Sequence, residues 1–302
     1  MQGQIVVSGL TKVYPKVRAV DDLSFTVEPG RVTGFLGPNG SGKTTTLRMM
    51  LNLVRPTAGT ATIDGKPYVE LEDPLGVVGA VLEASSAHKG RTGRNHLRVA
   101  CEAAGYPAKR VDEVLELVGL TPAARRKFKG YSMGMRQRLG IATAILGDPH
   151  VLILDEPANG LDPEGIRWLR QFLRTFAAGG RTVLVSSHLL AEMEQLADDV
   201  IIIAAGKMIA QGPLDRILNG VATATKVRVR TPDADALTAE LVRAGATVTP
   251  NGDGTLQVTG VDAPAVGRAA LAARAELHEL VEDRPDLEQV FLELTQGKAG
   301  IR

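Results

Sequence analysis

The sequence has a single cysteine, Cys101, among 302 residues, and only 4% of its residues are aromatic. One cysteine excludes a disulfide within the chain, which fits a reducing compartment. No apolar run approaches the roughly 18–20 residues that a membrane-spanning helix needs; the run VIIIAA at 200–205 has only the length of a strand. The N-terminal residues lack a basic segment followed by an apolar stretch, so we expect no signal peptide.

An excess of one charge is also missing, because 35 Lys and Arg residues oppose 34 Asp and Glu residues, a formal net charge of +1. We therefore expect no bulk attraction to nucleic acid or anionic lipid, and no direct insertion into a membrane. Any work at a membrane would go through a partner protein. The length accommodates one large domain and a small one, and both could bury a core.

The first two thirds of the chain predict a mixed α/β fold. Residues 4–10 and 22–28 alternate in polarity and predict antiparallel strands. Residues 31–37 predict a short strand that runs into a glycine loop, and 43–53 predict the helix after it. The stretch from about 93 to 147 is rich in helical patterns, with helices expected at 96–105 and 111–120.

Two continuous apolar runs follow, at 150–157 and 181–188, of the kind found in a parallel sheet that is covered on both faces. A helical pattern at 163–177 lies between them and predicts a βαβ unit. Residues 198–212 predict a hairpin that turns at Gly206.

A new series of predicted strands and helices begins after residue 220. The order βαββαβ with an added helix at 286–295 predicts a small α+β, ferredoxin-like domain over 221–302, behind a larger domain at 1–220. RNA binding is not expected, because 221–290 contain no Phe, Tyr or Trp and more acids than bases. A regulatory or dimer-supporting role and a passive stabilising role both stay open for this domain.

The stretch GPNGSGKTTT matches the phosphate-loop pattern G-x-x-x-x-G-K-[ST]. Glycines let backbone N–H groups converge on a phosphate, and the N-terminus of the following helix adds a positive dipole end. In a chain with 33 glycines a chance match is conceivable, but the strand before and the helix after are the context the motif requires. The candidate ATP-binding residues are Gly37, Pro38, Asn39, Gly40, Ser41, Gly42, Lys43, Thr44 and Thr45.

Three further polar residues end the two apolar runs. Asp155 and Glu156 follow the first run, at the strand end where open parallel sheets bind ligands, and His188 follows the second. Asp155 and Thr44 are candidate Mg²⁺ ligands, and Glu156 is the candidate to activate the attacking water. A lone acid pair is usually a helix cap and a lone histidine is usually structural, but a phosphate loop in the same sheet favours the catalytic interpretation, with His188 sensing the γ-phosphate.

The order of these motifs, with YSMGMRQR (131–138) before LILDEPANGLDP (152–163) and SSH, resembles the nucleotide-binding domain of ABC transporters. The resemblance covers roughly 4–218. It implies a P-loop NTPase of ABC type, with a mixed core sheet, an antiparallel β subdomain and a helical subdomain at about 84–147. The implied substrate is ATP, with Mg²⁺ as its cofactor.

In that family two domains dimerise head to tail, and a Ser-x-Gly turn of one copy completes the ATP site of the other. The resemblance assigns this trans contact to Ser132, Met133, Gly134 and Met135. A hydroxyl, a backbone N–H and a helix N-terminus suit an anion, although a Ser-capped helix without a ligand is the plain alternative. Tyr14 resembles the aromatic residue that stacks on adenine, and Asp162 resembles the acid of the loop at the dimer interface.

The sequence departs from the family pattern at two places. The usual signature is Leu-Ser-Gly-Gly-Gln, and here Tyr131, Met133 and Met135 replace three of its five residues. Glu83 stands where a glutamine is expected; it is either a Mg²⁺ ligand or a plain surface acid. These departures, together with TGRNHL (92–97), resemble the branch that exports antibiotics and drugs, of bacitracin or daunorubicin type.

The resemblance implies the ATPase subunit of an exporter, which works as a homodimer beneath a separate membrane permease, at the cytoplasmic face of the cell membrane. The segment 83–96 is expected to contact that permease. A soluble ABC ATPase that acts on ribosomes or DNA is an alternative, although the chain has neither a second ATPase domain nor zinc-binding cysteines. An importer ATPase is a second alternative, and a regulator without catalysis is a third.

Overall fold

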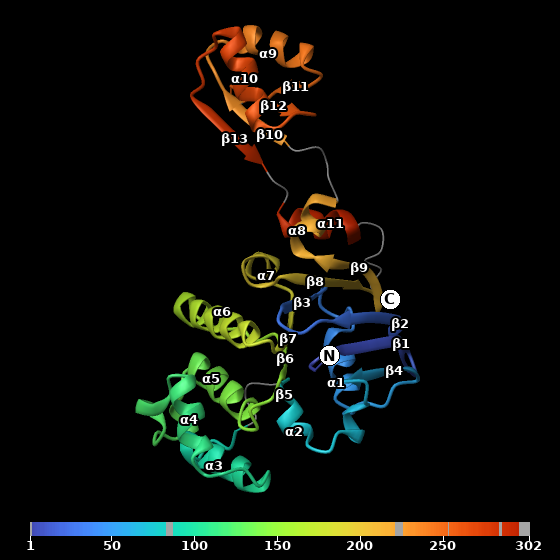
Figure 1. Ribbon diagram of the computed structural model, residues 1–302, viewed down its shortest axis with the longest axis vertical. Coiled ribbons are helices and arrows are strands. Elements are labelled where there is room, and N and C mark those ends of the chain that lie inside the picture. Colours follow the sequence, from blue (N-terminus) through green and yellow to red (C-terminus); the bar gives the residue numbers. More distant parts are fainter. Residues whose placement is uncertain (1, 83–86, 221–225, 253, 284–285, 296–302) are drawn as a thin grey trace. The chain divides into compact units, whose positions relative to one another are not determined.

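The computed structural model describes residues 2–82, 87–220, 226–252, 254–283 and 286–295. The chain forms two compact units, Met1–Leu214 and Asp215–Leu294 (Figure 1). None of the described helices is long and apolar enough to cross a membrane.

The first unit contains two sheets and the helices that accompany them. Its strands are β1 (Ile5–Tyr14), β2 (Val17–Val27), β3 (Val32–Leu36), β4 (Ala58–Ile63), β5 (Val78–Val81), β6 (Val151–Asp155), β7 (Thr182–Ser187), β8 (Asp199–Ala204) and β9 (Lys207–Pro213). Its α-helices are α1 (Lys43–Met50), α2 (Pro74–Val77), α3 (Gly93–Ala103), α4 (Arg110–Leu117), α5 (Met133–Ala144), α6 (Pro163–Ala178) and α7 (Leu190–Leu196).

The larger sheet has six strands in the order β5-β6-β7-β3-β8-β9. All neighbouring pairs are parallel except β8 and β9, which form the predicted hairpin at Gly206. Every residue of β3 and β7 is buried, because their apolar runs lie between layers on both faces. In the register, Leu36 of β3 faces Ser187 of β7, and Asp155 of β6 faces Ser186. The carboxyl ends of these three strands therefore meet at one edge.

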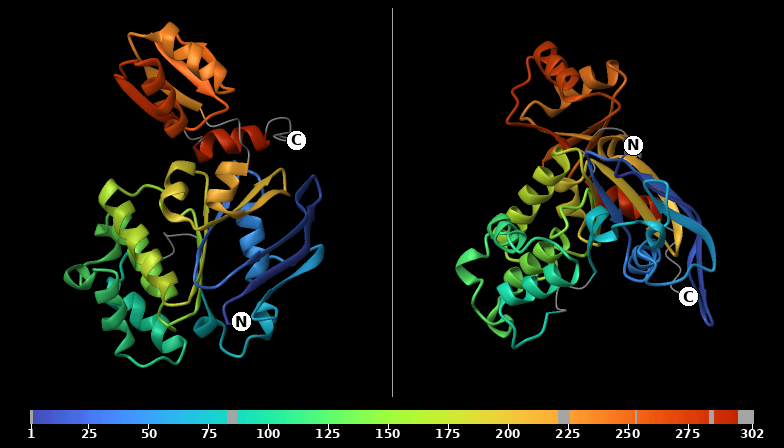
Figure 2. Two further views of the ribbon diagram at one scale, coloured as in Figure 1. Left: turned by 45° about the horizontal axis from the view of Figure 1, so that its top comes forward. Right: turned by 60° about the horizontal axis from the view of Figure 1, so that its bottom comes forward.

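The smaller sheet is antiparallel, in the order β2-β1-β4. It lies on one side of the unit, whereas α3, α4 and α5 gather on the opposite side (Figure 2).

The helix expected at 96–105 begins earlier, at Gly93, because the Thr92 hydroxyl accepts a hydrogen bond from Asn95 N at 3.2 Å and caps it. The helix expected at 43–53 ends at Met50. The mixed sheet, antiparallel sheet and helical group agree with the expected fold class.

The second unit contains the expected βαββαβ order. Strands β12 and β10 lie at the centre of an antiparallel sheet of order β11-β12-β10-β13, and Leu237 of α9 and Val266 of α10 are among its fully buried core residues. Its elements are α8 (Leu214–Gly220), β10 (Lys226–Arg230), α9 (Ala234–Arg243), β11 (Thr247–Pro250), β12 (Thr255–Thr259), α10 (Ala263–Ala273), β13 (Glu279–Asp283) and α11 (Leu287–Thr295).

Candidate ATPase site

The glycine loop between β3 and α1 forms a cradle for an anion. Gly40 and Gly42 have φ values of 80° and 105°, in the region that favours glycine. A Cβ on Gly42 would lie 2.5 Å from the Ala19 carbonyl oxygen, so only glycine fits there. The hydroxyl of Ser41 is buried without a partner among the described residues. Helix α1 has neither an acid in its first turn nor a side-chain cap, so its N-terminal N–H groups suit a phosphate.

Lys43 crosses this cradle with a side chain that is only 6% exposed. Its Nζ donates a hydrogen bond to the Gly37 carbonyl oxygen at 2.7 Å and lies 3.4 Å from Glu156 Oε1. A nearly buried ammonium group needs such partners, because desolvation of an unpaired charge is costly. The sequence-predicted lysine and acid are thus brought together as an ion pair.

The predicted metal ligands Thr44 and Asp155 lie side by side. Thr44 Oγ1 donates to Asp155 Oδ2 at 2.7 Å, and the Ser186 hydroxyl donates to Asp155 Oδ1. A hydroxyl and a carboxylate oxygen are ligands that suit Mg²⁺, which usually takes one or two protein ligands beside waters and substrate phosphates. The donor set therefore fits the ion. The other candidate ligand, Glu83, lies outside the described residues.

Glu156 and His188 form the third pair at this edge. His188 Nδ1 lies 2.7 Å from Glu156 Oε2, and the two residues follow neighbouring parallel strands. Glu156 has a φ of 49°, and its backbone N–H donates to the Ser186 hydroxyl at 3.0 Å, which holds the turn in place. The prediction that both side chains share one sheet edge is confirmed.

Residues 39–45 of the glycine loop and α1, together with Glu156 and His188, line one cavity of about 360 Å³. Gly37, Pro38 and Asp155 are not among the lining residues, but Asp155 is hydrogen-bonded to Thr44, which is. The lining also includes Ala19 and Asn159, which the sequence reasoning did not single out. Asn159 lies in the stretch PANGLDP and could have been found there, whereas Ala19 has no chemical signal and is placed by the fold alone. Ser186, which orients both Asp155 and Glu156, was also missed, although it is part of the quoted SSH motif.

Several predicted site residues do not line this cavity. Tyr14 stands at the end of β1, 40% exposed, with Lys12 Nζ 5.1 Å from its ring centroid. The signature residues lie on the helical side, where Ser132 caps α5 by accepting from Met135 N at 3.3 Å. The side chain of Met133 is 49% exposed. Asp162 caps α6 by accepting from Gly165 N at 2.8 Å. None of the signature residues Ser132, Met133, Gly134 and Met135 lines the phosphate cavity of its own chain.

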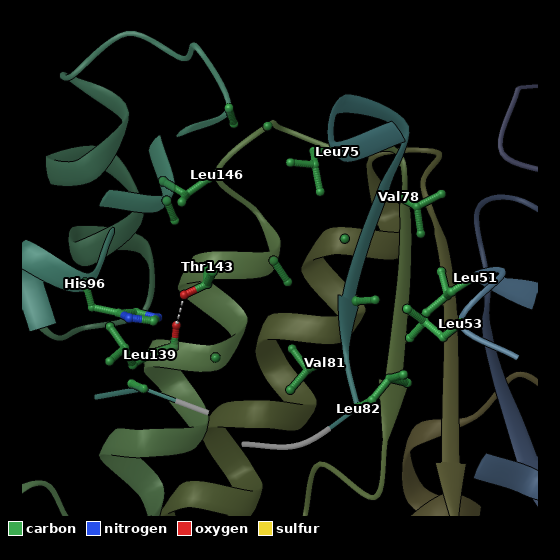
Figure 3. A pocket seen from close by; sticks show the side chains of 18 of the residues that line it. Leu51, Leu53, Leu75, Val78, Val81, Leu82, His96, Leu139, Thr143 and Leu146 are labelled. Atoms are coloured by element: carbon green, nitrogen blue, oxygen red, sulfur yellow. Dashed lines mark hydrogen bonds between the residues drawn. The ribbon is translucent and has the colours of Figure 1, made fainter. Parts of the chain in front are cut away.

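A second cavity, of about 720 Å³ and mainly apolar, lies between the helical group and β5. Leu75, Val78 and Val81 approach it from α2 and β5, and His96 and Leu139 approach from α3 and α5 (Figure 3). Among the described residues that line it there is no Asp or Glu. We call this cavity the apolar groove. Burial lowers the pKa of His96, so its imidazole is neutral at pH 7.

A parallel sheet with a phosphate loop after one strand and acids after its neighbour defines a P-loop nucleoside triphosphatase. The family described as "ABC transporter" matches residues 20–159. The chain is 36% identical over 317 residues to the daunorubicin/doxorubicin resistance ATP-binding protein DrrA of Streptomyces peucetius, covering 99% of this chain and 94% of that protein. It is 42% identical over 216 residues to the bacitracin transport ATP-binding protein BcrA of Bacillus licheniformis, covering 70% and 71%. The chain belongs to the ABC transporter ATP-binding proteins, as the motifs predicted, and is an ATPase of that type.

Solved structures agree with this assignment. One described as the ATP-binding subunit of an ABC transporter superimposes with a TM-score of 0.64 at 29% identity, over 72% of this chain and 92% of that chain. The cassette MJ0796, described as dimeric, in a post-hydrolysis state and bound to ADP and Pi, shares the fold with a TM-score of 0.63 at 23% identity, over 70% and 98%. Residues 225–288 match a family described only as a domain of unknown function.

Proposed function

We propose that this chain drives the export of a drug, an antibiotic or another amphiphile through a separate permease, with ATP hydrolysis as its energy source. The alignment with DrrA carries this proposal, because it extends over 99% of this chain and so includes both units. The similarity to BcrA, a bacitracin transport protein, supports the same class of substrate. The permease would hold the chain at the cytoplasmic face of the membrane.

Hydrolysis would start from the Glu156 carboxylate. In this structure Lys43 and His188 both hold that carboxylate, at 3.4 Å and 2.7 Å. The γ-phosphate of ATP offers Lys43 and His188 a competing acceptor, which frees Glu156 to take a proton from the attacking water. The water oxygen then bonds to the γ-phosphorus, and the bond to the bridging oxygen of ADP breaks. Thr44 and Asp155 would hold Mg²⁺, which neutralises charge on the phosphates.

A second copy would complete each ATP site. The turn at Ser132 and Gly134 lies outside the cavity that its own phosphate loop lines, so it is free to meet another molecule. In the same chain, a Cβ on Gly134 would contact Leu161, so the loop that leads to Asp162 adjoins the signature. The dimeric cassette MJ0796 supports a dimer of this fold. In this proposal Asp162 lies at the dimer interface and Tyr14 stacks on adenine.

The permease would dock in the apolar groove. The groove is lined from both the sheet and the helical group, and His96 belongs to the segment that was expected to contact the permease. Its volume and apolar lining suit a short amphipathic helix of a membrane protein. For the second unit we propose a regulatory or dimer-supporting role.

The experiment that tests this function is purification of tagged Glu156→Gln protein with ATP from detergent-solubilised native cells. A polytopic membrane protein at a near-equal amount is the expected partner. Ribosomes, DNA-repair proteins or the absence of a partner would contradict transport and favour a soluble ABC ATPase. A solute-binding protein in the same complex would favour an importer.

Docking in the groove predicts that Leu75→Glu lowers the recovery of the membrane protein at least about tenfold, because the carboxylate would lose its hydration in a mainly apolar interface. Leu75 lines the groove and is 51% exposed, so the free chain tolerates the charge. Leu117→Glu is the matched control, since Leu117 is 58% exposed on α4 and does not line the groove. Equal recovery with both variants in a quantitative pull-down would place the permease elsewhere.

A further inference from the structure

A departure from the family signature lies against the TGRNHL stretch. Tyr131 occupies the first signature position, and Gly93 belongs to TGRNHL, 38 residues earlier in the chain. Tyr131 is only 4% exposed. A Cβ on Gly93 would overlap the Tyr131 hydroxyl oxygen and lie 3.0 Å from the ring carbon that bears it. Gly93 begins α3 with a negative φ, so its backbone conformation does not require glycine. The close approach of the Tyr131 side chain does require it.

The Tyr131 hydroxyl has a specific partner. It donates a hydrogen bond to the Ala123 carbonyl oxygen at 2.9 Å. The ring packs against Phe128 with 5.9 Å between ring centroids and 43° between ring planes. Burial raises the pKa of the Tyr131 phenol, so it stays a neutral donor at physiological pH. A leucine, which the family usually has here, would make neither the hydrogen bond nor the aromatic contact.

Backbone hydrogen bonds join the two segments that surround Tyr131. Arg94 N donates to Ala124 O at 2.8 Å, Phe128 N donates to Arg91 O at 2.9 Å, and Lys129 N donates to Lys89 O at 3.0 Å. These bonds join residues 89–94 to residues 124–129. Tyr131 follows the second segment after one residue, Gly130, and precedes Ser132, the cap of α5. The Tyr131 side chain therefore lies between these two joined segments and the signature helix α5.

We infer that Tyr131 is a positioning residue, which fixes the Ser132 turn against residues 89–94 and for which Gly93 leaves the necessary space. This inference rests on the proposed trans contact of Ser132 with the ATP of a second copy. The segment 89–94 leads into α3, and His96 of α3 lines the apolar groove. A displacement of that segment by a partner in the groove would thus be transmitted to Ser132 through the tyrosine.

A double-mutant cycle tests the contact, with Tyr131→Leu, Gly93→Ala and the double variant, each in a Glu156→Gln background. The readout is the dissociation constant of the dimer by sedimentation equilibrium at saturating ATP and Mg²⁺. Each single variant is expected to weaken the dimer about tenfold. The double variant should be no weaker than Tyr131→Leu alone, because the leucine lacks the atoms that the alanine methyl displaces. ATP affinity of the monomer should stay unchanged throughout.

Tyr131→Phe removes only the hydroxyl, so it keeps the fold and gives a second, milder test. With Glu156 intact, its turnover should fall at low protein concentration and recover at high concentration, which a merely structural defect would not do. Additive effects in the cycle, or parental dimerisation in all variants, would overturn the inference. Ser132→Arg distinguishes a failure of the Tyr131 inference from a failure of the trans ATP contact. If Ser132→Arg blocks dimerisation while the cycle shows no coupling, the positioning role of Tyr131 fails and the trans site stands. If Ser132→Arg has no effect, the trans site itself fails.

Discussion

Glu156→Gln should lower ATP turnover by about 10²–10⁴-fold, the range by which a positioned general base accelerates a reaction. Glutamine has nearly the same volume and keeps an acceptor for His188, so the cavity should still bind ATP. It also removes the negative charge 3.4 Å from Lys43, which leaves the ammonium free for the phosphate. We therefore expect a variant that binds ATP, remains dimeric and hardly releases phosphate. Phosphate release measures the turnover, sedimentation with ATP measures the dimer, and nucleotide titration measures ATP binding.

Glu164→Gln is the control for this change. Glu164 is exposed in the first turn of α6, and it does not line the phosphate cavity. Its turnover should equal that of the parent protein. Parental turnover in Glu156→Gln would show that another group accepts the proton, and the role of Glu156 would have to be abandoned.

Ser132→Arg should abolish ATP-driven dimerisation while the monomer still binds ATP. The arginine would place a long charged side chain at the turn that meets the second copy, and it would remove the cap of α5. Loss of a central interface contact costs about 2 kcal/mol or more, which corresponds to at least about 30-fold in the dimer dissociation constant. Nucleotide titration of the monomer and sedimentation with ATP check the two halves of this prediction.

Ser132→Ala separates the cap from the interface. It removes the hydroxyl that accepts from Met135 N and should cost about 1 kcal/mol of stability. Its dimer should be weakened less than that of Ser132→Arg, because no bulk is added. If Ser132→Arg dimerised with ATP as the parent does, the signature would be a plain capped helix and the trans site would be refuted.

The sequence predicted the central sheet because its strands are marked by physical patterns that act locally. Residues 151–154 and 183–185, at the centres of the two runs, are all apolar, and they are buried on β6 and β7 as that pattern requires. The parallel order of the strands then brought Glu156 and His188 to one edge. For Glu156 and His188, the sequence motif and the order of the strands therefore predict the same location.

The contacts between distant segments could not be predicted in this way. The approach of Gly93 to Tyr131 depends on how α3 packs beside the signature helix, and neither residue has a periodicity that marks it. The ion pair between Lys43 and Glu156 also joins residues that are far apart in sequence. The start of α3 was placed too late because a threonine cap outweighed the apolar periodicity on which the prediction rested.

The central claim is that each ATP site combines the phosphate loop of one copy with the signature of another. The most direct test mixes Lys43→Ala protein with Ser132→Arg protein, each of which should be nearly inactive alone. A mixed dimer carries the arginine at only one of its two ATP sites, and its other site is complete. At a protein concentration where mixed dimers form, turnover should therefore rise above that of either variant, to at most about a quarter of the parental value. A mixture as inactive as its components would contradict the claim, because intact sites would then have to form within one chain.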